Sequence, residues 1–376
     1  MSEFLIIGGG VIGLLVAREL AAAGAKVTLV EQGQCCRESS WAGGGIVSPL
    51  YPWRYSPAVT ALASQAQQAY PQLVTQLLDE TGIDPEFERT GLLMLDAKDE
   101  EEALQWAATN DKALYPVAPS FIYDREAELA PGFGKGLWMP DIANIRNPRL
   151  GQALLGSLQR NPHTRIRENT RVLSLHTITS GTSRGRRVSH VEVLCEGVVE
   201  LLGAEHVIIT AGAWSGGLLE TLDVSLPVVP VKGQMLLFRP PRRLLETIVL
   251  TDGRYLIPRR DNYLLMGSTL EHTAFDKSTT EEALQSLRRS AEALLPALAE
   301  CRVERQWAGL RPGAPDGVPF IGRVPGIDNL YVNAGQYRNG LVLAPASAQL
   351  LVDIVLERRP SVDPSPYDPI SRSVTG

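Results

Sequence analysis

Cysteine is scarce in this chain and is not arranged as a metal site or a disulfide framework. The four cysteines among 376 residues are Cys35, Cys36, Cys195 and Cys301. They form no CxxC pair and no cluster with histidine, so we expect no bound metal. The adjacent Cys35 and Cys36 could act as a redox pair, but free cysteine commonly packs as a small apolar residue, and this is the expectation here.

The chain also lacks a basic block, a long apolar run and a cationic leader. Its net charge is −6, from 36 Lys+Arg and 42 Asp+Glu, so neither nucleic acid nor an anionic membrane is an expected partner. Its apolar runs are too short to span a bilayer, and because the first residues, MSEFLIIGGG, run directly into an apolar strand, we expect no signal peptide. We therefore expect a cytoplasmic protein, and its length and 44% hydrophobic content predict more than one core.

The start of the chain indicates a strand–helix–strand unit. A short apolar run at residues 4–7 precedes an Ala- and Leu-rich helical stretch at 11–23, and a second apolar run follows. Gly8, Gly10 and Gly13 lie between the first strand and the helix, in the spacing Gly-x-Gly-x-x-Gly. The first glycine permits a tight turn, the second lets a pyrophosphate approach the backbone, and the third lets helix and strand pack closely.

An acidic residue, Glu31, closes the second strand, eighteen residues beyond Gly13. A carboxylate at this place can accept hydrogen bonds from ribose hydroxyls and would repel a 2′-phosphate, which argues against NADP. The glycine spacing alone is weak evidence. Strand, loop, helix and acid together predict a bound dinucleotide.

Farther along, the chain alternates helical and strand-like stretches. Helices are expected at residues 64–80 and 346–358, and residues 182–187 (TSRGRR) suggest the tip of a hairpin. Thr279-x-x-Glu282 has the pattern of a capping box that opens another helix. The order of the elements indicates a discontinuous nucleotide domain that is interrupted by a sheet domain.

Seven segments, spread over nearly the whole chain, have patterns of a known flavoprotein family. They are FLIIGGGVIGLLVARELAAAGAKVTLVEQ, SSWAGGGIVSP, VIITAGAWS, PVKGQML, RYLIPR, WAGLRPGAPDGVPFIG and NAGQYRNGLVLAPAS. In this order they resemble the D-amino acid oxidase family, and most closely the glycine oxidases of the thiamine pathway (ThiO). The first segment is shared by many FAD and NAD proteins, whereas the last two together are much more specific.

The resemblance implies non-covalent FAD and an α/β (α+β) fold, in which a discontinuous Rossmann-type FAD-binding domain is joined to a second, antiparallel-sheet substrate domain. The FAD-binding domain would comprise residues 1–86, 147–226 and 306–376, and the substrate domain residues 87–146 and 227–305. The family also implies a homo-oligomer, often a tetramer, O2 as electron acceptor and a role in thiamine biosynthesis.

The resemblance also implies a set of FAD contacts. The ADP part would meet the first segment, the pyrophosphate and the flavin ring would meet the second, and the adenine would meet the backbone of Val172. A helix beginning near Gly340 would direct its positive end at the flavin N1–C2=O region. The cofactor-binding residues so implied are Gly8, Gly10, Val11, Ile12, Gly13, Glu31, Gln32, Ser39, Gly43, Gly44, Gly45, Val172, Gly212, Gln336, Tyr337, Arg338, Asn339, Gly340, Leu341 and Val342.

Three residues match substrate-binding positions of the family. Arg311, in GLRPG, matches the arginine that binds the substrate carboxylate, and a forked guanidinium suits such a planar anion better than lysine does. Tyr255, in RYLIPR, matches a tyrosine whose hydroxyl helps to hold the carboxylate. Arg338, in QYRNG, matches an arginine near the flavin and the substrate.

The implied reaction is oxidative deamination of a small amino acid: glycine, sarcosine, another N-substituted glycine or a small D-amino acid. The products would be a 2-oxo acid, ammonia or an amine, and H2O2. Because hydride would pass from Cα to flavin N5, no side chain is expected to be a catalytic base. The five histidines are scattered, and even His272, which follows a strand of the substrate domain, is expected to be structural.

The sequence departs from the family at three positions that bear on the substrate. Trp41 stands among residues that are usually small and is expected to narrow or shift the flavin-side pocket. Gly253 stands where a glycine oxidase can carry histidine, and Leu270 where a pocket methionine can occur. These differences leave the choice of amino acid open.

Three other functions remain open from the sequence. A D-amino acid dehydrogenase would keep the fold and pass electrons to a quinone. A sarcosine-oxidase-type enzyme would bind flavin covalently through a cysteine, but residues 309–319 contain none and Cys301 lies too early. A non-catalytic FAD-binding protein is disfavoured by the presence of both Arg311 and Tyr255.

Overall fold

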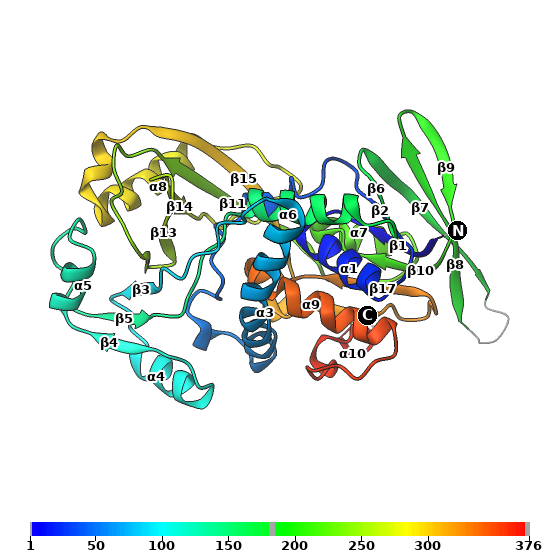
Figure 1. Ribbon diagram of the computed structural model, residues 1–376, viewed down its shortest axis with the longest axis horizontal. Coiled ribbons are helices and arrows are strands. Elements are labelled where there is room, and N and C mark those ends of the chain that lie inside the picture. The colour runs from blue at the N-terminus through cyan, green and yellow to red at the C-terminus, as the bar shows by residue number, and fades with distance from the viewer. Residues whose placement is uncertain (1, 180–184, 373–376) are drawn as a thin grey trace.

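A six-stranded, mainly parallel sheet forms one part of the molecule, whose computed structural model describes residues 2–179 and 185–372 (Figure 1). The strand order is β16-β17-β10-β1-β2-β6, and only β16 and β17 pair antiparallel. The strands are β1 (Ser2–Ile7), β2 (Val27–Val30), β6 (Thr164–Arg167), β10 (Ala204–Ile209), β16 (Phe320–Arg323) and β17 (Leu330–Ala334). The order reverses between β1 and β10, which is where ligands bind in open α/β sheets.

Both faces of this sheet are covered. Successive side chains of a strand point to opposite faces; accordingly Phe4 and Ile6 belong to one core cluster, and Leu5 and Ile7 to another. The first cluster lies under α1 (Val11–Ala22), α3 (Pro57–Thr81), α6 (Asn147–Arg160) and α9 (Gly340–Val355). The second lies under α7 (Ser215–Glu220) and the three-stranded sheet β7 (Thr170–Thr179), β8 (Arg186–Cys195) and β9 (Val198–Leu202).

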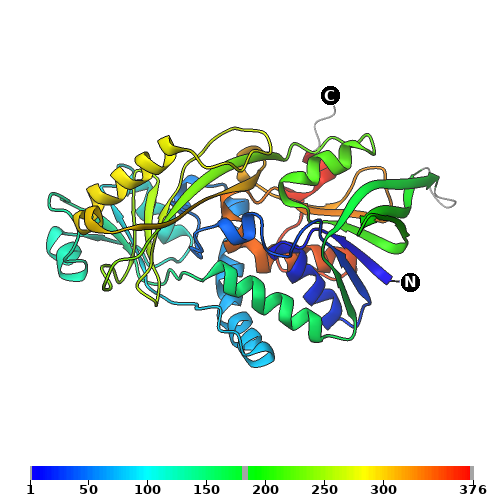
Figure 2. The same ribbon diagram turned by 90° about the horizontal axis from the view of Figure 1, so that it is seen from above.

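An eight-stranded sheet lies beside the parallel sheet (Figures 1 and 2). Its order is β15-β11-β14-β13-β12-β3-β5-β4, and only β3 and β12 pair parallel. The strands are β3 (Leu92–Leu95), β4 (Tyr115–Val117), β5 (Gly136–Met139), β11 (Val229–Phe238), β12 (Ile248–Thr251), β13 (Arg254–Pro258), β14 (Leu264–Gly267) and β15 (Val303–Gly313). The predicted α/β (α+β) class is confirmed.

Different helices pack on the two faces of the eight-stranded sheet. One packs against α5 (Pro119–Arg125) and α8 (Glu281–Leu294), the other against α4 (Glu100–Thr109). The strand β15 crosses the predicted domain limit between residues 305 and 306 and pairs with β11 along its length. The division of the chain into two domains stays a prediction.

Two helices begin earlier than the sequence pattern predicted. The helix expected at residues 64–80 begins at Pro57, because proline suits a first helical position and Ser56 Oγ accepts a hydrogen bond of 3.5 Å from the Val59 N–H. The helix that the pattern predicted at 346–358 begins at Gly340, where the family resemblance implied a helix start, and it contains Pro345.

Pro345 is tolerated inside α9 because its missing N–H is replaced. A proline leaves the carbonyl four residues earlier without its helical donor, here the carbonyl of Leu341. The hydroxyl of the fully buried Tyr70, on α3, donates to that oxygen. A helix–helix contact therefore replaces the lost backbone hydrogen bond.

The start of α8 and the turn between β7 and β8 were also predicted from local patterns. The capping box at Thr279 and Glu282 is wrong by one residue: Thr280 is the N-cap of α8, and its hydroxyl accepts from the Ala283 N–H. Residues 182–184 of the expected hairpin tip lie outside the described residues, while β7 and β8 on either side pair antiparallel.

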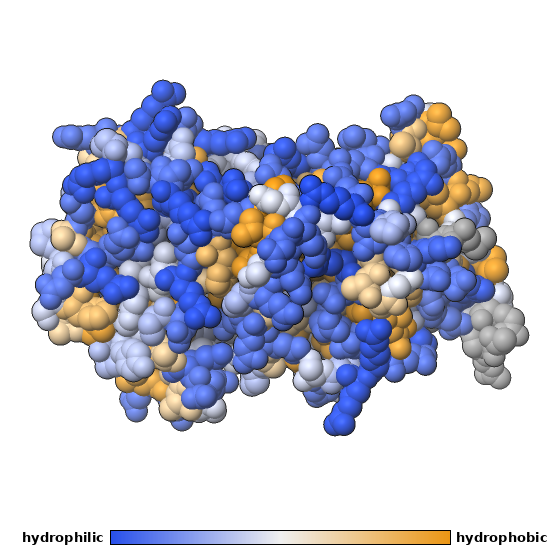
Figure 3. Space-filling model, viewed as in Figure 1, coloured by the Kyte–Doolittle hydropathy of each residue, from blue (hydrophilic) through white to orange (hydrophobic). Residues whose placement is uncertain are grey.

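The surface seen in Figure 3 is mainly hydrophilic, and apolar atoms gather at the right-hand end over the three-stranded sheet. There Val198, Val199 and Leu201 of β9 are exposed, whereas Val191 and Val193 of β8 are buried toward the parallel sheet. Within the described ranges, none of the helices has the length and apolar character needed to cross a membrane.

Candidate active site

A cavity of about 440 Å³ lies where the carboxyl ends of the parallel strands meet the eight-stranded sheet. Ile7, Val30 and Thr210, at the ends of β1, β2 and β10, line it from one side. Tyr255 and Arg311, from β13 and β15, line it from the other. Its volume is that of a site for a cofactor or a drug-sized ligand.

The glycine loop between β1 and α1 closes tightly. Gly8 has a positive φ of 112°, and a Cβ there would lie 2.6 Å from the Thr210 carbonyl oxygen. A Cβ on Gly13 would lie 2.0 Å from the Gly8 carbonyl oxygen, so this glycine serves helix–strand packing. Gly10 is the N-cap of α1 and lines the cavity, which directs the positive end of the helix at any ligand there.

Glu31 is held at the end of β2 by backbone donors. Its Oε2 accepts a hydrogen bond of 2.8 Å from the Gly9 N–H, and its Oε1 accepts one of 2.9 Å from the Gly33 N–H. Burial raises the pKa of this carboxyl, and the two N–H groups oppose that rise. Each carboxylate oxygen has a further lone pair, so the group can also accept from ligand hydroxyls.

The short helix α2 (Ser39–Ala42) forms the next wall. Ser40 Oγ accepts a hydrogen bond of 2.9 Å from the Val11 N–H at the start of α1. The loop that follows is anchored by the buried Arg259, which donates to the Gly44 carbonyl at 2.7 Å and to the Ile145 carbonyl at 3.0 Å. Burial lowers the pKa of Arg259 to about 10.

Arg311 lies across strand β11 with its guanidinium in the cavity wall. Nη2 donates to Ser268 Oγ at 2.7 Å, and Nη1 donates to the carbonyls of Lys232 and Thr269 at 3.3 and 3.2 Å. A Cβ on Gly233 would lie 2.2 Å from Nη1, so the arginine can take this place only because residue 233 is glycine. Burial lowers the pKa of Arg311.

Tyr255 lies beside Arg311 on the cavity face of the eight-stranded sheet. Its ring covers two glycines: a Cβ on Gly267 would lie 2.6 Å from the ring, and one on Gly44 would lie 3.1 Å from it. Its hydroxyl is 3.9 Å from the sulfur of Met235, a weak acceptor. The phenol can therefore donate to a ligand held by Arg311.

Arg338 lines the same cavity but is exposed, unlike Arg311. It follows Tyr337, which has a positive φ of 49° and also lines the cavity. Burial raises the pKa of the nearby Tyr55, and the positive charge of Arg338 opposes that rise. Arg338 thus places a cation at the rim of the cavity.

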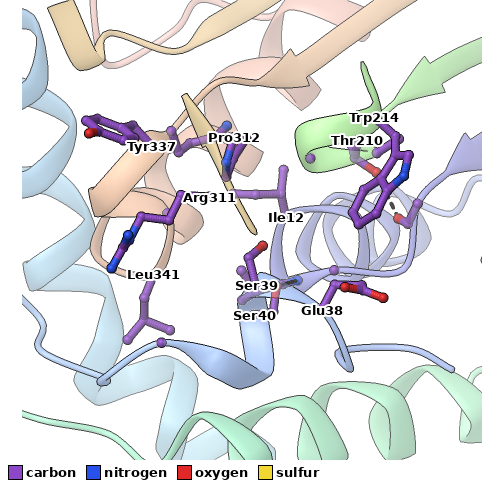
Figure 4. Close-up of a pocket in the computed structure, with 18 of the residues that line it drawn as sticks. Ile12, Glu38, Ser39, Ser40, Thr210, Trp214, Arg311, Pro312, Tyr337 and Leu341 are labelled. Carbon is purple, nitrogen blue, oxygen red and sulfur yellow. Dashed lines mark hydrogen bonds between the residues drawn. The ribbon is translucent and has the colours of Figure 1, made fainter. Parts of the chain in front are cut away.

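The structure gathers most of the predicted site residues around this one cavity. Every predicted cofactor and substrate residue lines it except Gly13, which lies in α1 against the Gly8 carbonyl, and Asn339, which is buried. Figure 4 shows Arg311, Tyr337 and Leu341 on one side and Thr210, Trp214 and Glu38 on the opposite side, with Ile12, Ser39 and Ser40 between them.

Several lining residues were missed from the sequence. They come from many segments of the chain, and none of them was predicted individually as a contact. The polar and aromatic ones are Glu38, Ser40, Ser48, Asn147, Thr170, Arg171, Thr210, Trp214, Ser268, Phe275 and Asn333. Five of them lie in segments that the family resemblance had already singled out: Ser40 and Ser48 in SSWAGGGIVSP, Thr210 and Trp214 in VIITAGAWS, and Asn333 in NAGQYRNGLVLAPAS.

The three departures from the family pattern do not line the cavity. The expectation that Trp41 narrows it is wrong: its ring meets Trp307 of β15 edge-on at 5.6 Å and lies under the guanidinium of Arg305. Gly253 lies in the turn between β12 and β13, and Leu270 is exposed. A ligand in the cavity therefore meets none of these three residues directly.

The residues present fit FAD. Gly8 and Gly10 leave backbone open beside the start of α1, where phosphates bind. Glu31 lies beside the glycine loop, where ribose hydroxyls would reach it, and Arg311 and Tyr255 line the cavity from the eight-stranded sheet. None of the four cysteines, all within the described residues, lines the cavity, and Cys301 donates to the Ala297 carbonyl in a separate core. The flavin would therefore be held without a thioether bond.

The chain is similar over almost its whole length to known flavoproteins. A family model described as FAD dependent oxidoreductase (DAO) matches residues 3–354. A glycine oxidase of Pseudomonas aeruginosa is 52% identical over 378 residues, covering 99% of this chain and 100% of that protein. A glycine oxidase of Pseudomonas putida is 51% identical over 370 residues, covering 98% and 99%. The crystal structure of glycine oxidase from Geobacillus kaustophilus has a TM-score of 0.87 at 28% identity and covers 98% of each chain.

Proposed function

The chain belongs to the FAD-dependent oxidoreductase family DAO and is an FAD-dependent amino acid oxidase, and we propose that it oxidises glycine or a closely related small amino acid at the cavity between its two large sheets. The observation that carries this proposal is the pair of Arg311 and Tyr255 at one end of the FAD cavity.

Arg311 and Tyr255 would bind the substrate carboxylate. The guanidinium has five N–H donors, and three of them engage Ser268 and two carbonyls. The donors that remain, together with the phenol of Tyr255, suit the two oxygens of a carboxylate. This binding would fix the position of the neighbouring Cα relative to the cofactor.

FAD, when bound, supplies the acceptor for the hydrogen and two electrons that leave Cα. The chain's own contribution is to bind and orient the amino acid. The described residues that line the cavity include two carboxylates, Glu31 and Glu38, and no histidine or lysine. Both carboxylates lie toward the glycine loop, away from Arg311, which supports oxidation without a side-chain base.

Arg338 would have a separate role at the rim. As an exposed cation it would attract an anionic or zwitterionic substrate to the cavity before Arg311 binds the carboxylate. The other predicted cofactor contacts, the two-domain division, the cytoplasmic location, the homo-oligomer and the role in thiamine biosynthesis belong to this same proposal.

The test is a substrate panel on the purified yellow protein. O2 consumption and H2O2 release are measured with glycine, sarcosine, N-ethylglycine, D-alanine and D-proline. We expect turnover of glycine or sarcosine with one H2O2 for each O2. Anaerobic dye reduction without O2 consumption would instead favour the dehydrogenase, and a colourless protein would favour a function without catalysis.

A further inference from the structure

One loop of the substrate-side sheet reaches over the FAD cavity. Residues 268–280, here called the crossing loop, connect β14 to α8. At its start, Ser268 and Thr269 accept hydrogen bonds from Arg311. Farther along, Phe275 and Lys277 contact residues of the glycine-loop side. The loop thus runs from the carboxylate-binding arginine to the dinucleotide end of the same cavity.

The crossing loop meets the two flanks of the glycine loop. On one flank, Phe275 stacks on Trp214 with ring centroids 5.3 Å apart and planes at 28°. On the other, Lys277 Nζ lies 2.8 Å from Oε1 and 3.1 Å from Oε2 of Glu38. Phe275, Trp214 and Glu38 all line the cavity.

Trp214 and Glu38, the partners of Phe275 and Lys277, both connect to the glycine loop, where phosphates would lie. Glu38 precedes Ser39 and Ser40, and Ser40 binds the first N–H of α1. Trp214 follows Thr210, whose hydroxyl donates to the Gly8 carbonyl at 2.9 Å. The contacts of the crossing loop therefore span the opening above the glycine loop from one side to the other.

The buried residue Lys232, on β11, holds the crossing loop through backbone hydrogen bonds and an ion pair. Lys232 and Glu271 exchange two backbone hydrogen bonds of 2.9 and 3.0 Å, and Lys232 Nζ lies 2.7 Å from Asp276 Oδ2. The Lys232 side chain is 2% exposed. Asp276 lies between Phe275 and Lys277, so this ion pair holds the segment that makes both contacts.

We infer that the crossing loop is a second cofactor-binding wall, in which Phe275 and Lys277 close over the diphosphate part of FAD and retain it. Binding or release of FAD requires both the Phe275–Trp214 and the Lys277–Glu38 contacts to part. Lys277 also neutralises the carboxylate of Glu38. The substrate-side sheet thus contributes to cofactor retention as well as to substrate binding.

The rival explanation is purely electrostatic. Glu38, as an anion, would repel the phosphates, and Lys277, as a cation, would attract them, without any closure between them. The two explanations differ in what removal of Glu38 does. Loss of repulsion would slow FAD release, whereas loss of a closing contact would speed it.

The experiment measures the rate at which FAD leaves the holoenzyme after dilution, followed by the fluorescence of the free flavin. The variants are Lys277→Gln, Glu38→Gln and the double variant. We expect each single variant to release FAD about two- to fivefold faster, the range of an exposed ion pair, and the double variant to match the singles. Phe275→Ala should speed release by about three- to tenfold.

Lys135→Gln is the matched control, because Lys135 forms an ion pair of 2.9 Å with Glu100 at similar exposure, away from the cavity. Its release rate should equal that of the wild type. Slower release from Glu38→Gln would overturn the inference in favour of repulsion alone. Unchanged rates in all four cavity variants would overturn it as well.

Discussion

Lys232 Nζ lies 2.7 Å from Asp276 Oδ2, although the lysine side chain is almost fully buried and the aspartate side chain is 50% exposed. The backbone carbonyl of the same lysine accepts a hydrogen bond from Arg311. One residue of β11 therefore supports Arg311, the proposed substrate-binding residue, with its backbone and the crossing loop with its side chain. A substitution that disturbs Asp276 should therefore be detectable at Arg311, and one that disturbs Arg311 should be detectable at Asp276.

The Lys232–Asp276 pair should make stability depend on acidic pH. The hydrogen bond from Lys232 holds the pKa of Asp276 below its ordinary 3.8, at about 2. Because the folded-state pKa is lowered, the stability that this group adds is complete above pH 3.8 and is lost as the pH falls toward 2. Glu271, the other carboxylate facing Lys232, also has a lowered pKa.

Thermal unfolding of the wild type and of Asp276→Asn should therefore be compared from about pH 3 to pH 7. We expect the wild type to have the higher Tm at neutral pH and the difference to shrink below about pH 4. A difference that stays constant over the whole range would contradict a charge-based contribution.

Ser268→Ala should weaken the support of Arg311. The hydroxyl accepts the 2.7 Å bond from Nη2, and loss of one such bond costs about 1 kcal/mol, or about fivefold in KM. We expect KM for glycine to rise by this factor with little change in kcat, because the acceptor chemistry is untouched. Ser268→Thr keeps a hydroxyl and is the control, for which KM should stay closer to that of the wild type.

Gly233→Ala should displace Arg311 directly. The new methyl group would lie 2.2 Å from Nη1, so the guanidinium must leave its place across β11. We expect KM to rise by more than about tenfold, since a misplaced positioning residue costs much of the binding, while the absorbance of the bound flavin is retained. An unchanged KM would show that the arginine does not hold the substrate from this position.

Tyr70→Phe should destabilise the fold through α9. The lost hydroxyl leaves the Leu341 carbonyl without a donor, and a buried unsatisfied carbonyl costs about 1–3 kcal/mol in the free energy of unfolding. In a Pro345→Ala background the backbone N–H at 345 can supply the missing bond. Urea unfolding of the four proteins in this cycle should therefore show a smaller cost of Tyr70→Phe when Pro345 is absent. Equal costs in both backgrounds would contradict this account.

The dinucleotide half of the site could be predicted because its chemistry is local. Gly8, Gly10 and Gly13 are fixed by one turn, and the structure gives each the surroundings that this turn requires. Glu31 could be predicted because it comes directly after β2, the next strand of the same unit. Arg311 and Tyr255 came from the family resemblance, since a strand arginine and a strand tyrosine carry no local sign of binding.

The rest of the site could not be predicted because it arises from contacts between distant segments. Phe275 and Trp214 are 61 positions apart, and only the packing of the two sheets brings them together. The surroundings of Trp41, in α2, could not be predicted for the same reason, because its partner Trp307 lies on β15, far away in sequence. The family resemblance placed the start of α9 near Gly340, but the sequence pattern placed it at residue 346, because Pro345 normally argues against a helix and the compensating hydroxyl of Tyr70 is far away in sequence.

The central claim, that Arg311 binds the substrate carboxylate, is tested most directly by kcat/KM for glycine in Arg311→Lys. Lysine keeps the positive charge but lacks the planar fork and cannot reproduce the bonds to Ser268 and a carboxylate together. The account predicts that kcat/KM falls by about a hundredfold, mainly through KM, while flavin absorbance shows that FAD is still bound. A value within twofold of the wild type would contradict it.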